Sequence, residues 1–586
     1  MAPDLHASTG DHVCVVGTGV LGLVAIKNLK EQGLQVTAFE RNEHIGGLWH
    51  VSDNQDQVTA TSMTTANTSK HTVSGAPSLM VQHVMIQDDL TSDQSCFTDF
   101  PYTDDVSMHP PAKSIHEYLE SYAKHFGLLQ HIRYSSQVTR VERDDESRKW
   151  IVYTVNASQN GNTDSSRHVF DRLVVATGIL SARNVVKIPG VNQFDGEVLH
   201  SQEFKDAYRF SGKNVLVVGI GATGADTTSF LKKAGAANIY ISHRGQTYLL
   251  PRVMDGKAFD HSMSYRVGCI TRQLASWSPW AWATMLTKAL RTAQFKAFPW
   301  LKSHNSFSSP RVPPTAPMLH RVPIFSDDLA QNLRDGSVKS VVGVHEINGP
   351  RTVMLTDGSV LSDIDAIVIC SGYHYDFSVV SGAGNPIDAT KAPDNYRRIQ
   401  AAPYYEPESP FPRLYQGYIS EQYPESLAFL GHMLVLGPPF VIYDLATMAL
   451  ASIWSGNAPM PTDTAMSRDI NAHYDFIVKA LHNDRVPHPG VRINGKATYN
   501  WMNEAAGTGV TDLLGNFSIA ACKLWWTDRH FYNLLMDGAS VPAVYRLFDM
   551  GRGRKPWNGA RKHIEKINKE IEDLGMAWKR EKAKLN

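Results

Sequence analysis

Val13–Gly22, which reads VCVVGTGVLG, is the stretch that decides the fold, because four apolar residues run directly into a G-x-G-x-x-G turn. In such a turn the first glycine permits the bend, the second lets the backbone touch a pyrophosphate, and the third lets the helix pack against the strand. The pattern predicts a strand, a helix to about Lys30 and a second strand over Val36–Glu40. The predicted dinucleotide-binding glycines are Gly17, Gly19 and Gly22.

An acidic residue completes this first unit. Glu40 ends the second strand, 18 residues beyond Gly22, where a carboxylate can accept hydrogen bonds from a ribose hydroxyl. The first site is therefore predicted to bind an adenosine without a 2′-phosphate, as in FAD or NAD. The alternative is an ordinary glycine turn, which the strand before it, the helix after it and the acid at Glu40 argue against.

Val215–Gly224, which reads VLVVGIGATG, repeats the plan about 200 residues later, with a helix to about Lys233 and a strand over Asn238–Ser242. This strand ends Ser242-His243-Arg244 and has no acid where the first unit has Glu40. An arginine there can pair with a 2′-phosphate, so this site is predicted to prefer NADPH. The alternative is that Arg244 is a solvated surface charge. The predicted NADPH-binding residues are Gly219, Gly221, Gly224, Ser242 and Arg244.

Two dinucleotide sites with different ribose chemistry imply hydride transfer from NADPH to a flavin. A chain of 586 residues has room for two to four domains. We expect an α/β fold with two Rossmann-like dinucleotide-binding domains, the NADPH domain inserted in the FAD domain, and a mixed C-terminal extension. The predicted parts are 1–212 and 336–455 for the FAD domain, 213–335 for the NADPH domain with an aromatic insertion at about 253–325, and 456–586 for an extension packed on the FAD domain.

Composition excludes several classes of protein. The formal net charge is zero, which gives no electrostatic footprint for nucleic acid. The five cysteines are scattered and form no C-x-x-C pair, so we expect neither a disulfide framework nor a zinc ribbon. We expect a reducing, cytoplasmic location instead. The longest apolar stretch, Leu427–Trp454, is broken by Gly-Pro-Pro, so no transmembrane segment is expected.

The aromatic insertion leaves two interpretations open. Trp277, Trp280 and Trp282 stand near the cations Arg272, Lys288 and Arg291. Such a segment either makes peripheral contact with a membrane or lines a pocket or core, and the second is the commoner use of buried aromatics. The sequence also leaves a homo-oligomer open.

Several longer runs together resemble the flavin-containing monooxygenase family, the N- and S-oxygenating type of class B flavoprotein monooxygenases. One of them fits that family's signature F-x-G-x-x-x-H-x-x-x-[YF], and the resemblance spans nearly the whole chain. The runs are Glu40–Trp49, Asn67–Lys70, Cys96–Pro101, Phe194–Phe204 and Lys555–Arg561.

The resemblance implies a reaction in which NADPH reduces FAD, O2 adds at flavin C4a, and a nitrogen or sulfur lone pair of a small-molecule substrate attacks the resulting hydroperoxyflavin. Asn67 corresponds to the family's active-site asparagine and is the predicted catalytic residue, as a neutral hydrogen-bond donor. Its alternative role is to cap a loop beside Thr68. No metal site is expected.

The resemblance also extends the list of residues expected to contact a cofactor. Two rival functions remain, a Baeyer–Villiger oxygenation of a ketone and a non-catalytic flavin-binding redox sensor. Residues 71–95 insert 25 positions between the Asn67 motif and Cys96, so the mouth of the site is expected to be particular to this chain. The further cofactor contacts are Gly47, Leu48, Trp49, Thr68, Val138, Ala176, Thr177, Gly178, Gly372, Gly437 and Phe440.

Overall fold

The structure is a computed structural model, and it places most of the chain. Asn67, Thr68 and Gly437, which the sequence proposes as site residues, lie outside the described residues. The described residues are 10–52, 64, 70, 96–158, 165–178, 182–258, 261, 264–308, 323–387, 394–406, 411–434, 439–483, 485–486, 490, 492, 495–515 and 518–585.

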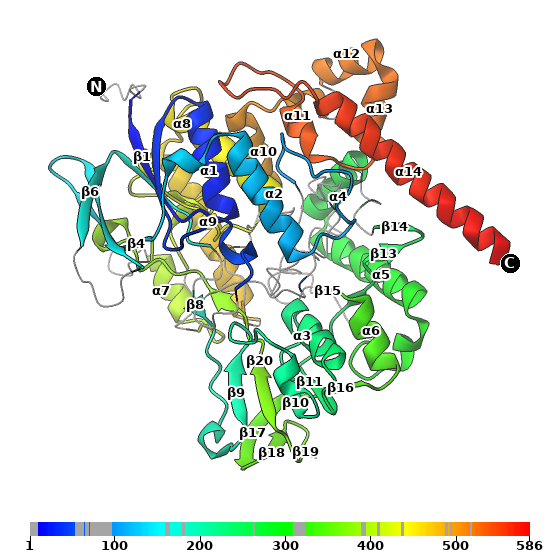
Figure 1. Cartoon of the computed structure of the whole chain (residues 1–586). Helices are drawn as coiled ribbons and strands as arrows, with labels where there is room; N and C mark the ends of the chain where they lie inside the picture. The colour runs from blue at the N-terminus through cyan, green and yellow to red at the C-terminus, as the bar shows by residue number, and fades with distance from the viewer. Residues whose placement is uncertain are drawn as a thin grey trace.

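The first glycine turn follows an inner strand of a seven-stranded sheet, in the upper part of Figure 1. Strand β1 (His12–Val16) pairs in parallel with β2 (Gln35–Phe39) on one side and with β7 (Arg172–Val175) on the other. Helix α1 (Val20–Glu31) follows the turn, which confirms the predicted βαβ unit. The sheet is completed by β3 (Ile132–Arg133), β22 (Leu414–Tyr415), β23 (Ile419–Ser420) and β24 (Leu427–Phe429).

The second glycine turn belongs to a separate five-stranded sheet in the lower part of Figure 1. Its central strand β10 (Asn214–Val218) leads into helix α3 (Ala222–Lys233) and pairs in parallel with β11 (Asn238–Ser242). All described pairings in this sheet are parallel. The other strands are β16 (Val338–Val341), β20 (Ala366–Ile369) and β9 (Glu197–His200). The predicted architecture of two Rossmann-like domains is confirmed.

The predicted domain boundaries at residues 213 and 335 are wrong. Strands β9, β16 and β20 lie outside 213–335, yet each pairs within the second sheet. The second domain therefore begins before β9 and ends after β20. The apolar sequence of a short strand such as β20 predicts that the strand is buried, but it does not indicate which sheet the strand joins. The chain enters and leaves this domain through β8 (Ala182–Arg183) and β21 (Tyr373–His374), which pair with each other.

Smaller sheets of short strands pack on both domains. A three-stranded antiparallel sheet packs on the first domain, and another extends from the second (Figure 1). Two short two-stranded pairings lie at the ends of the aromatic insertion, partly inside it. The strands are β4 (Ser136–Asp144), β5 (Lys149–Asn156) and β6 (Ser166–Phe170); β17 (Val344–Gly349), β18 (Thr352–Leu355) and β19 (Val360–Leu361); β12 (Leu249–Leu250) with β15 (Ile324–Phe325); and β13 (Val253–Met254) with β14 (Lys257–Ala258).

The aromatic insertion forms a helical hairpin, α4 (Tyr265–Trp277) and α5 (Pro279–Ala297). The sequence leaves two roles open for its tryptophans, contact with a membrane and packing in a pocket or core, and the tryptophans differ in their exposure. Trp282 is buried in a small apolar cluster with Leu250 and Phe325, whereas Trp277 and Trp280 at the tip of the hairpin are 77% and 70% exposed. Helix α6 (Asp327–Arg334) then returns the chain to the second sheet.

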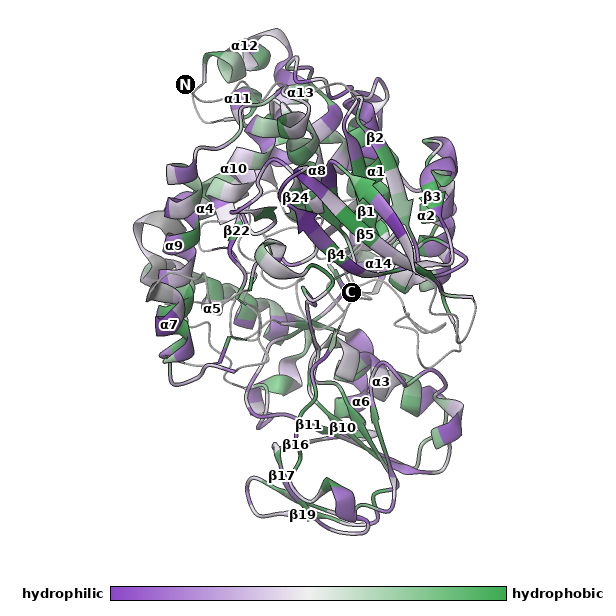
Figure 2. Ribbon diagram, turned by 90° about the vertical axis from the view of Figure 1, so that its left-hand side faces the viewer, coloured by the Kyte–Doolittle hydropathy of each residue, from purple (hydrophilic) through white to green (hydrophobic). Residues whose placement is uncertain are grey.

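Helices of the C-terminal half cover the first domain. Helix α8 (Pro439–Trp454) is apolar and buried along its length and packs against α1, and Figure 2 shows much of α1 in the green of hydrophobic residues. Ile564, Ile567 and Ile571 of α14 (Ala560–Leu585) join the first domain's core, while Leu574 is exposed. The remaining helices are α2 (Ala112–His125), α7 (Asp394–Gln400), α9 (Asp463–Leu481), α10 (Gly495–Ala506), α11 (Val510–Leu513), α12 (Ile519–Thr527) and α13 (Arg529–Asp537).

Candidate dinucleotide-binding site

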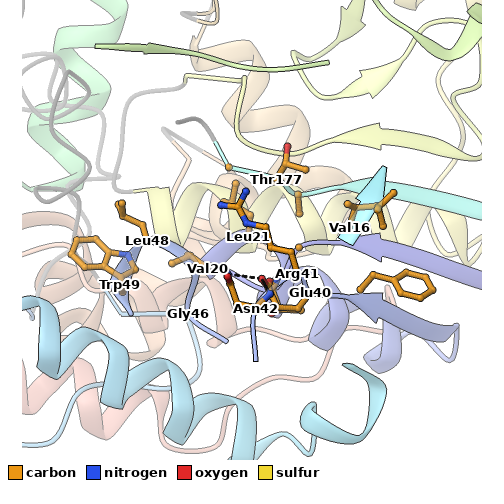
Figure 3. A pocket seen from close by; sticks show the side chains of 18 of the residues that line it. Val16, Val20, Leu21, Glu40, Arg41, Asn42, Gly46, Leu48, Trp49 and Thr177 are labelled. Carbon is orange, nitrogen blue, oxygen red and sulfur yellow. Dashed lines mark hydrogen bonds between the residues drawn. The ribbon is translucent and has the colours of Figure 1, made fainter. Parts of the chain in front are cut away.

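A cavity of about 380 Å³ opens at the carboxyl end of β1, which is the end where open α/β sheets bind their ligands. Its walls come from the first glycine turn, the segment 46–49, strand β4 and the first turn of α8. Figure 3 shows side chains that line this cavity, with Glu40 and Arg41 on one side and Leu48 and Trp49 on another.

The first glycine turn has the geometry that a pyrophosphate requires. Gly17 has φ +95°, and a Cβ on it would lie 2.7 Å from the carbonyl oxygen of Ala176. Gly22 packs the helix on the strand, since its Cβ would lie 1.9 Å from the oxygen of Gly17. Gly19 begins α1, and among the described side chains none caps this helix end. The first N–H groups of α1 are therefore available to an anion.

Glu40 is held rigidly at the edge of the cavity. It is 4% exposed. Its Oε2 accepts hydrogen bonds from the backbone N–H and the hydroxyl of Thr18, both at 2.9 Å, and its Oε1 accepts from the backbone N–H (3.0 Å) and the amide (2.9 Å) of Asn42. A carboxylate has about four acceptor sites and no donor. These four hydrogen bonds therefore fix the orientation of the group at the edge of the cavity, and a ribose hydroxyl would share an oxygen with one of the protein donors.

Most of the predicted contacts to this cofactor do lie around the cavity. Gly22 is the exception among the glycines of the first turn, because it packs helix against strand. The predicted residues that line the cavity are Gly17, Gly19, Glu40, Gly47, Leu48, Trp49, Val138, Ala176, Thr177, Gly178 and Phe440.

The first turn of α8 closes the cavity on the side away from the sheet. Phe440 and Tyr443 line it, and the Tyr443 hydroxyl donates to the carbonyl oxygen of Met433 at 2.7 Å. The positive end of the α8 dipole therefore lies at the cavity. Gly437, predicted to precede this helix, is outside the described residues.

Sequence reasoning missed several residues of the cavity. Thr18 and Asn42, which orient Glu40, occupy variable positions of their motifs, so no residue-level signal marks them. Arg41 follows Glu40 directly and could have been proposed from that neighbourhood. Asp376 and Val379 come from a segment far along the chain that only the fold brings to the cavity.

The second glycine turn repeats the geometry of the first. Gly219 has φ +116°, and a Cβ on it would lie 2.3 Å from the oxygen of Cys370. A Cβ on Gly224 would lie 2.0 Å from the oxygen of Gly219. Gly221 begins α3, again with no side-chain cap among the described residues. The turn thus offers a second helix N-terminus to a pyrophosphate.

The predicted NADPH-specific residues differ in their surroundings. Arg244 is exposed just after β11, and no carboxylate pairs with it within the described part of the chain. Ser242 is buried, and its hydroxyl donates to the carbonyl oxygen of Val342 at 2.8 Å. Gly372 has φ +82°, and its carbonyl oxygen accepts from the backbone N–H of Asn184 at the junction between the domains. Of Ser242 and Arg244, the two side chains predicted for the NADPH site, Arg244 is therefore the better placed for a 2′-phosphate.

The donor set fits two dinucleotides and not a metal centre. Free helix N-termini, a pre-oriented carboxylate at the first site and an exposed arginine at the second match pyrophosphate, ribose and 2′-phosphate respectively. In the described segments no group of three or more His, Cys, Asp or Glu side chains could hold a metal ion. Across the same segments, no helix is long and apolar enough to cross a membrane.

Comparison with known proteins places this geometry in a family. The model of the flavin-binding monooxygenase-like family matches residues 10–392. Monooxygenase aurF of Gibberella zeae is 31% identical over 563 residues, which cover 96% of this chain and 98% of that protein. Dimethylaniline monooxygenase [N-oxide-forming] 2 of Mus musculus is 29% identical, over 78% of this chain and 76% of that protein.

The fold is shared with solved structures as well. Cyclohexanone monooxygenase from Rhodococcus sp. Phi1, solved bound to NADP+, superimposes with a TM-score of 0.55 at 18% identity, covering 85% of this chain and 97% of that one. At that identity the likeness concerns the fold alone. The two glycine turns, the pre-oriented Glu40 and the family match agree. The chain belongs to the flavin-binding monooxygenase-like family and is an oxidoreductase, a monooxygenase that uses FAD and NADPH.

Proposed function

We propose that this chain transfers one oxygen atom from O2 to a nitrogen or sulfur lone pair of a small molecule, with FAD in the cavity of the first domain and NADPH at the second glycine turn. In the balanced reaction, substrate, O2, NADPH and a proton give the oxidised substrate, NADP+ and water. The observation that carries the proposal is the cavity itself, where a helix N-terminus and the rigid carboxylate of Glu40 face one space.

Bound FAD, once reduced by NADPH, would supply the activation of O2. The backbone and side chains of this chain have three tasks. The N-terminus of α1 binds the pyrophosphate, Glu40 orients the ribose, and the apolar walls formed by Leu48, Trp49 and Phe440 exclude water. Exclusion of water matters because it strengthens every electrostatic interaction inside the site and prevents the loss of oxygen as peroxide.

Asn67 would be the residue that contacts the reacting atoms. It lies outside the described residues, so the proposal rests on its motif, Asn67–Lys70. Asn67→Leu removes a neutral donor at similar size, and loss of a preorganised donor costs about 2–4 kcal/mol of transition-state stabilisation. Product formation should fall on the order of a hundredfold while NADPH consumption falls less, with hydrogen peroxide making up the difference. A variant that keeps wild-type turnover and coupling would show that Asn67 only caps a loop.

Heteroatom oxygenation is preferred over ketone oxygenation because a relative that is 29% identical in sequence is named for forming an N-oxide, whereas cyclohexanone monooxygenase, at 18% identity, shares only the fold. The test gives the FAD-loaded enzyme NADPH, O2 and three matched substrates: a tertiary amine, a thioether and a cyclic ketone. We expect N-oxide or S-oxide in proportion to NADPH consumed. Lactone from the ketone with no product from the other two would overturn the proposal in favour of Baeyer–Villiger chemistry.

A further inference from the structure

A buried group of charges joins the C-terminal extension to helix α1. Arg546 has no solvent exposure. Its Nη1 donates to both carboxylate oxygens of Glu31 at 2.8 and 3.0 Å, and its Nη2 lies 3.3 Å from Asp99 Oδ2. Lys27 of α1 pairs with the same two carboxylates. Burying so many charges costs desolvation energy that their pairing only offsets, so such a group is better explained by the geometry it fixes than by stability.

The guanidinium of Arg546 also fixes the orientation of an amide between two helices. Nη2 donates to Asn28 Oδ1 at 2.9 Å, which turns the Asn28 amide nitrogen toward α8. That nitrogen donates to Asp444 Oδ1 at 2.8 Å and to the hydroxyl oxygen of Thr447 at 2.7 Å. If the amide were reversed, its N–H groups would face the guanidinium. Lys27 Nζ donates to the same Asn28 oxygen at 3.3 Å. Arg546, at the shorter distance, and Lys27 together therefore favour the orientation in which α1 donates and α8 accepts at this crossing.

A second chain of hydrogen bonds reaches the same carboxylate. Thr98 donates to Asp444 Oδ2 from its backbone N–H at 3.0 Å and from its hydroxyl at 2.7 Å, and the hydroxyl oxygen accepts from Arg546 Nε at 3.1 Å. Thr98, Asp444 and Arg546 are all fully buried. Burial alone would lower the pKa of Arg546, but Asp99, Glu31 and Asp444 raise it above its usual value, so the group stays charged.

The two helices held at this point both begin at the flavin cavity. Val20 and Leu21 of α1 and Phe440 and Tyr443 of α8 line it, and Figure 1 shows α1 and α8 close together in the upper part of the molecule. Asp444 lies one helical turn beyond Phe440, at about 1.5 Å of rise per residue. A change in how the helices cross at Asp444 would therefore change the distance between their first turns.

We propose that Arg546 is a positioning residue for the flavin, because by holding Asn28 and Thr98 against Asp444 it sets the crossing of α1 and α8 and so the width of the cavity between them. The inference rests on flavin binding in this cavity and not on which substrate is oxygenated. Arg546 lies beyond the residues 10–392 that the family model matches. The cofactor site of this chain would thus be completed by its C-terminal extension.

The test compares Arg546→Met, which removes the charge, with Arg546→Lys, which keeps the charge but not the planar fork. Three quantities are measured without any substrate: the dissociation constant of FAD, the midpoint potential of bound flavin and the unfolding midpoint of the FAD-free protein. We expect roughly tenfold weaker FAD binding and a shifted potential for Arg546→Met, as for a lost charge-assisted hydrogen bond, and a partial recovery for Arg546→Lys. The control is Arg561→Met, which removes a more exposed ion pair, that of Arg561 with Asp528 at 2.7 Å. It should change neither the dissociation constant of FAD nor the flavin potential.

Thr98→Val decides the matter if Arg546→Met does not fold. It keeps every charge and the shape of the side chain, and it removes only the hydroxyl between Arg546 and Asp444. FAD binding should weaken by roughly threefold, with a shifted flavin potential, as expected for one buried hydrogen bond. If Arg546→Lys and Thr98→Val bind FAD like the wild type at an unchanged potential, and only the unfolding midpoint falls, Arg546 is a structural brace and the inference is wrong. Because no product is measured, that result leaves the proposed reaction untouched.

Discussion

Gly19 and Gly22 stand three residues apart, but a methyl group has a different consequence at each. A Cβ on Gly19 would lie 3.7 Å from the nearest protein atom, on Gly47, whereas a Cβ on Gly22 would lie 1.9 Å from the oxygen of Gly17. Gly19 also has an ordinary φ of −69°. The protein itself therefore tolerates Gly19→Ala, and any loss of flavin in that variant reports on the ligand.

Gly19→Ala should give a folded protein that is poor in flavin. We expect the unfolding midpoint of the FAD-free protein to be nearly unchanged, and FAD to bind at least roughly tenfold more weakly, because the backbone at this position must approach the pyrophosphate. Absorbance of bound flavin and calorimetry of the FAD-free form measure the two effects. Gly22→Ala is the contrasting variant, which should lose fold and flavin together. A fully yellow Gly19→Ala protein would show that FAD binds elsewhere.

Arg244→Ala should separate the two nicotinamide cofactors. The guanidinium is exposed at the end of β11, and a charge-assisted hydrogen bond to a 2′-phosphate contributes about 1.5–3 kcal/mol, or roughly ten- to hundredfold in KM for NADPH. The KM for NADH should stay close to its wild-type value. Steady-state NADPH and NADH oxidation check this prediction. Equal losses for both cofactors would mean that Arg244 does not bind the 2′-phosphate, and no loss for either would mean that it is a solvated surface charge.

The limits of sequence reasoning are clear at this scale. The glycines and Glu40 could be predicted because a short motif specifies where the backbone must bend closely and where a negative charge must lie. Asp376 could not, since it reaches the cavity only after the chain has passed through the second domain. Ser242 is predicted from its position at the end of the strand, but its hydroxyl already donates to the carbonyl oxygen of Val342.

Three histidines join the segment 44–50 to helix α2 beside the cavity. The rings of His44 and His50 stack with centroids 3.3 Å apart, and His50 Nδ1 lies 3.3 Å from His116 Nε2. Burial and then His44 lower the pKa of His50. Burial also lowers the pKa of His116, against the opposing charge of Glu120, which is 3.6 Å away. His116 packs on the cavity wall, since a Cβ on Gly46 would lie 2.6 Å from its Nδ1.

This segment should make the stability of the fold sensitive to acid. Because the pKa values of His50 and His116 are lower in the folded state, the unfolded chain binds more protons, so their contribution to stability is complete above about pH 6.5 and is lost as the pH falls. We expect the unfolding midpoint to drop as the pH falls below about 6.5. His50→Gln should make that drop smaller without removing it, because burial also lowers the pKa of His432 to about 3 and that of His563 to about 4. The control is His345→Gln, which changes an exposed histidine on β17 and should leave the profile as it is. An unchanged profile in His50→Gln would remove the cluster as a cause.

Elements were predicted more reliably than their partners. The βαβ pattern placed β1, α1 and β11 within one or two residues, because a buried strand, a glycine turn and a helix each have a local signature. The stacking of the segment 44–50 on α2 has no such signature. It depends on a tertiary contact between residues about 70 positions apart.

At the scale of the whole molecule, the tip of the α4–α5 hairpin is an exposed aromatic surface next to positive charge. Trp277 and Trp280 protrude, and a groove along α5 is lined by cations that include Lys288 and Arg291. The span His261–Ser326 contains no aspartate or glutamate in a chain whose net charge is zero. Tryptophan is enriched at membrane interfaces, and each cation near an anionic bilayer contributes about 1 kcal/mol.

We therefore predict peripheral binding to anionic vesicles. The protein should sediment with vesicles that contain phosphatidylserine and not with pure phosphatidylcholine, and the double variant Trp277→Ala, Trp280→Ala should lose most of that binding. Lys113→Glu on α2, which lies on the other side of the molecule in Figure 2, is the matched charge control and should bind normally. Binding that is equal for both lipid compositions, or equal in the tryptophan variant, would count against this surface.

The number and nesting of the domains could be predicted from the sequence, but their boundaries could not. Two glycine turns predicted two nucleotide domains, one inside the other, and both sheets confirm this. The boundary failed because β9 and β20 are short apolar strands that either sheet could accept, and only the three-dimensional pairing decides between them.

The pairing of β8 with β21 has a consequence for how such a chain can be built. The polypeptide enters the second domain at Ala182–Arg183 and leaves it at Tyr373–His374, and these two segments are hydrogen-bonded neighbours. A unit whose ends are adjacent can be inserted into a host without stretching either partner. Residues from about 184 to 372 therefore form a unit with adjacent ends, whose further contact with the rest of the chain includes helix α4 against α13 and the ion pair of Arg266 with Asp537 at 2.6 Å. Grafting the corresponding unit of a relative at this junction should change the preference for the nicotinamide cofactor and leave the flavin half intact.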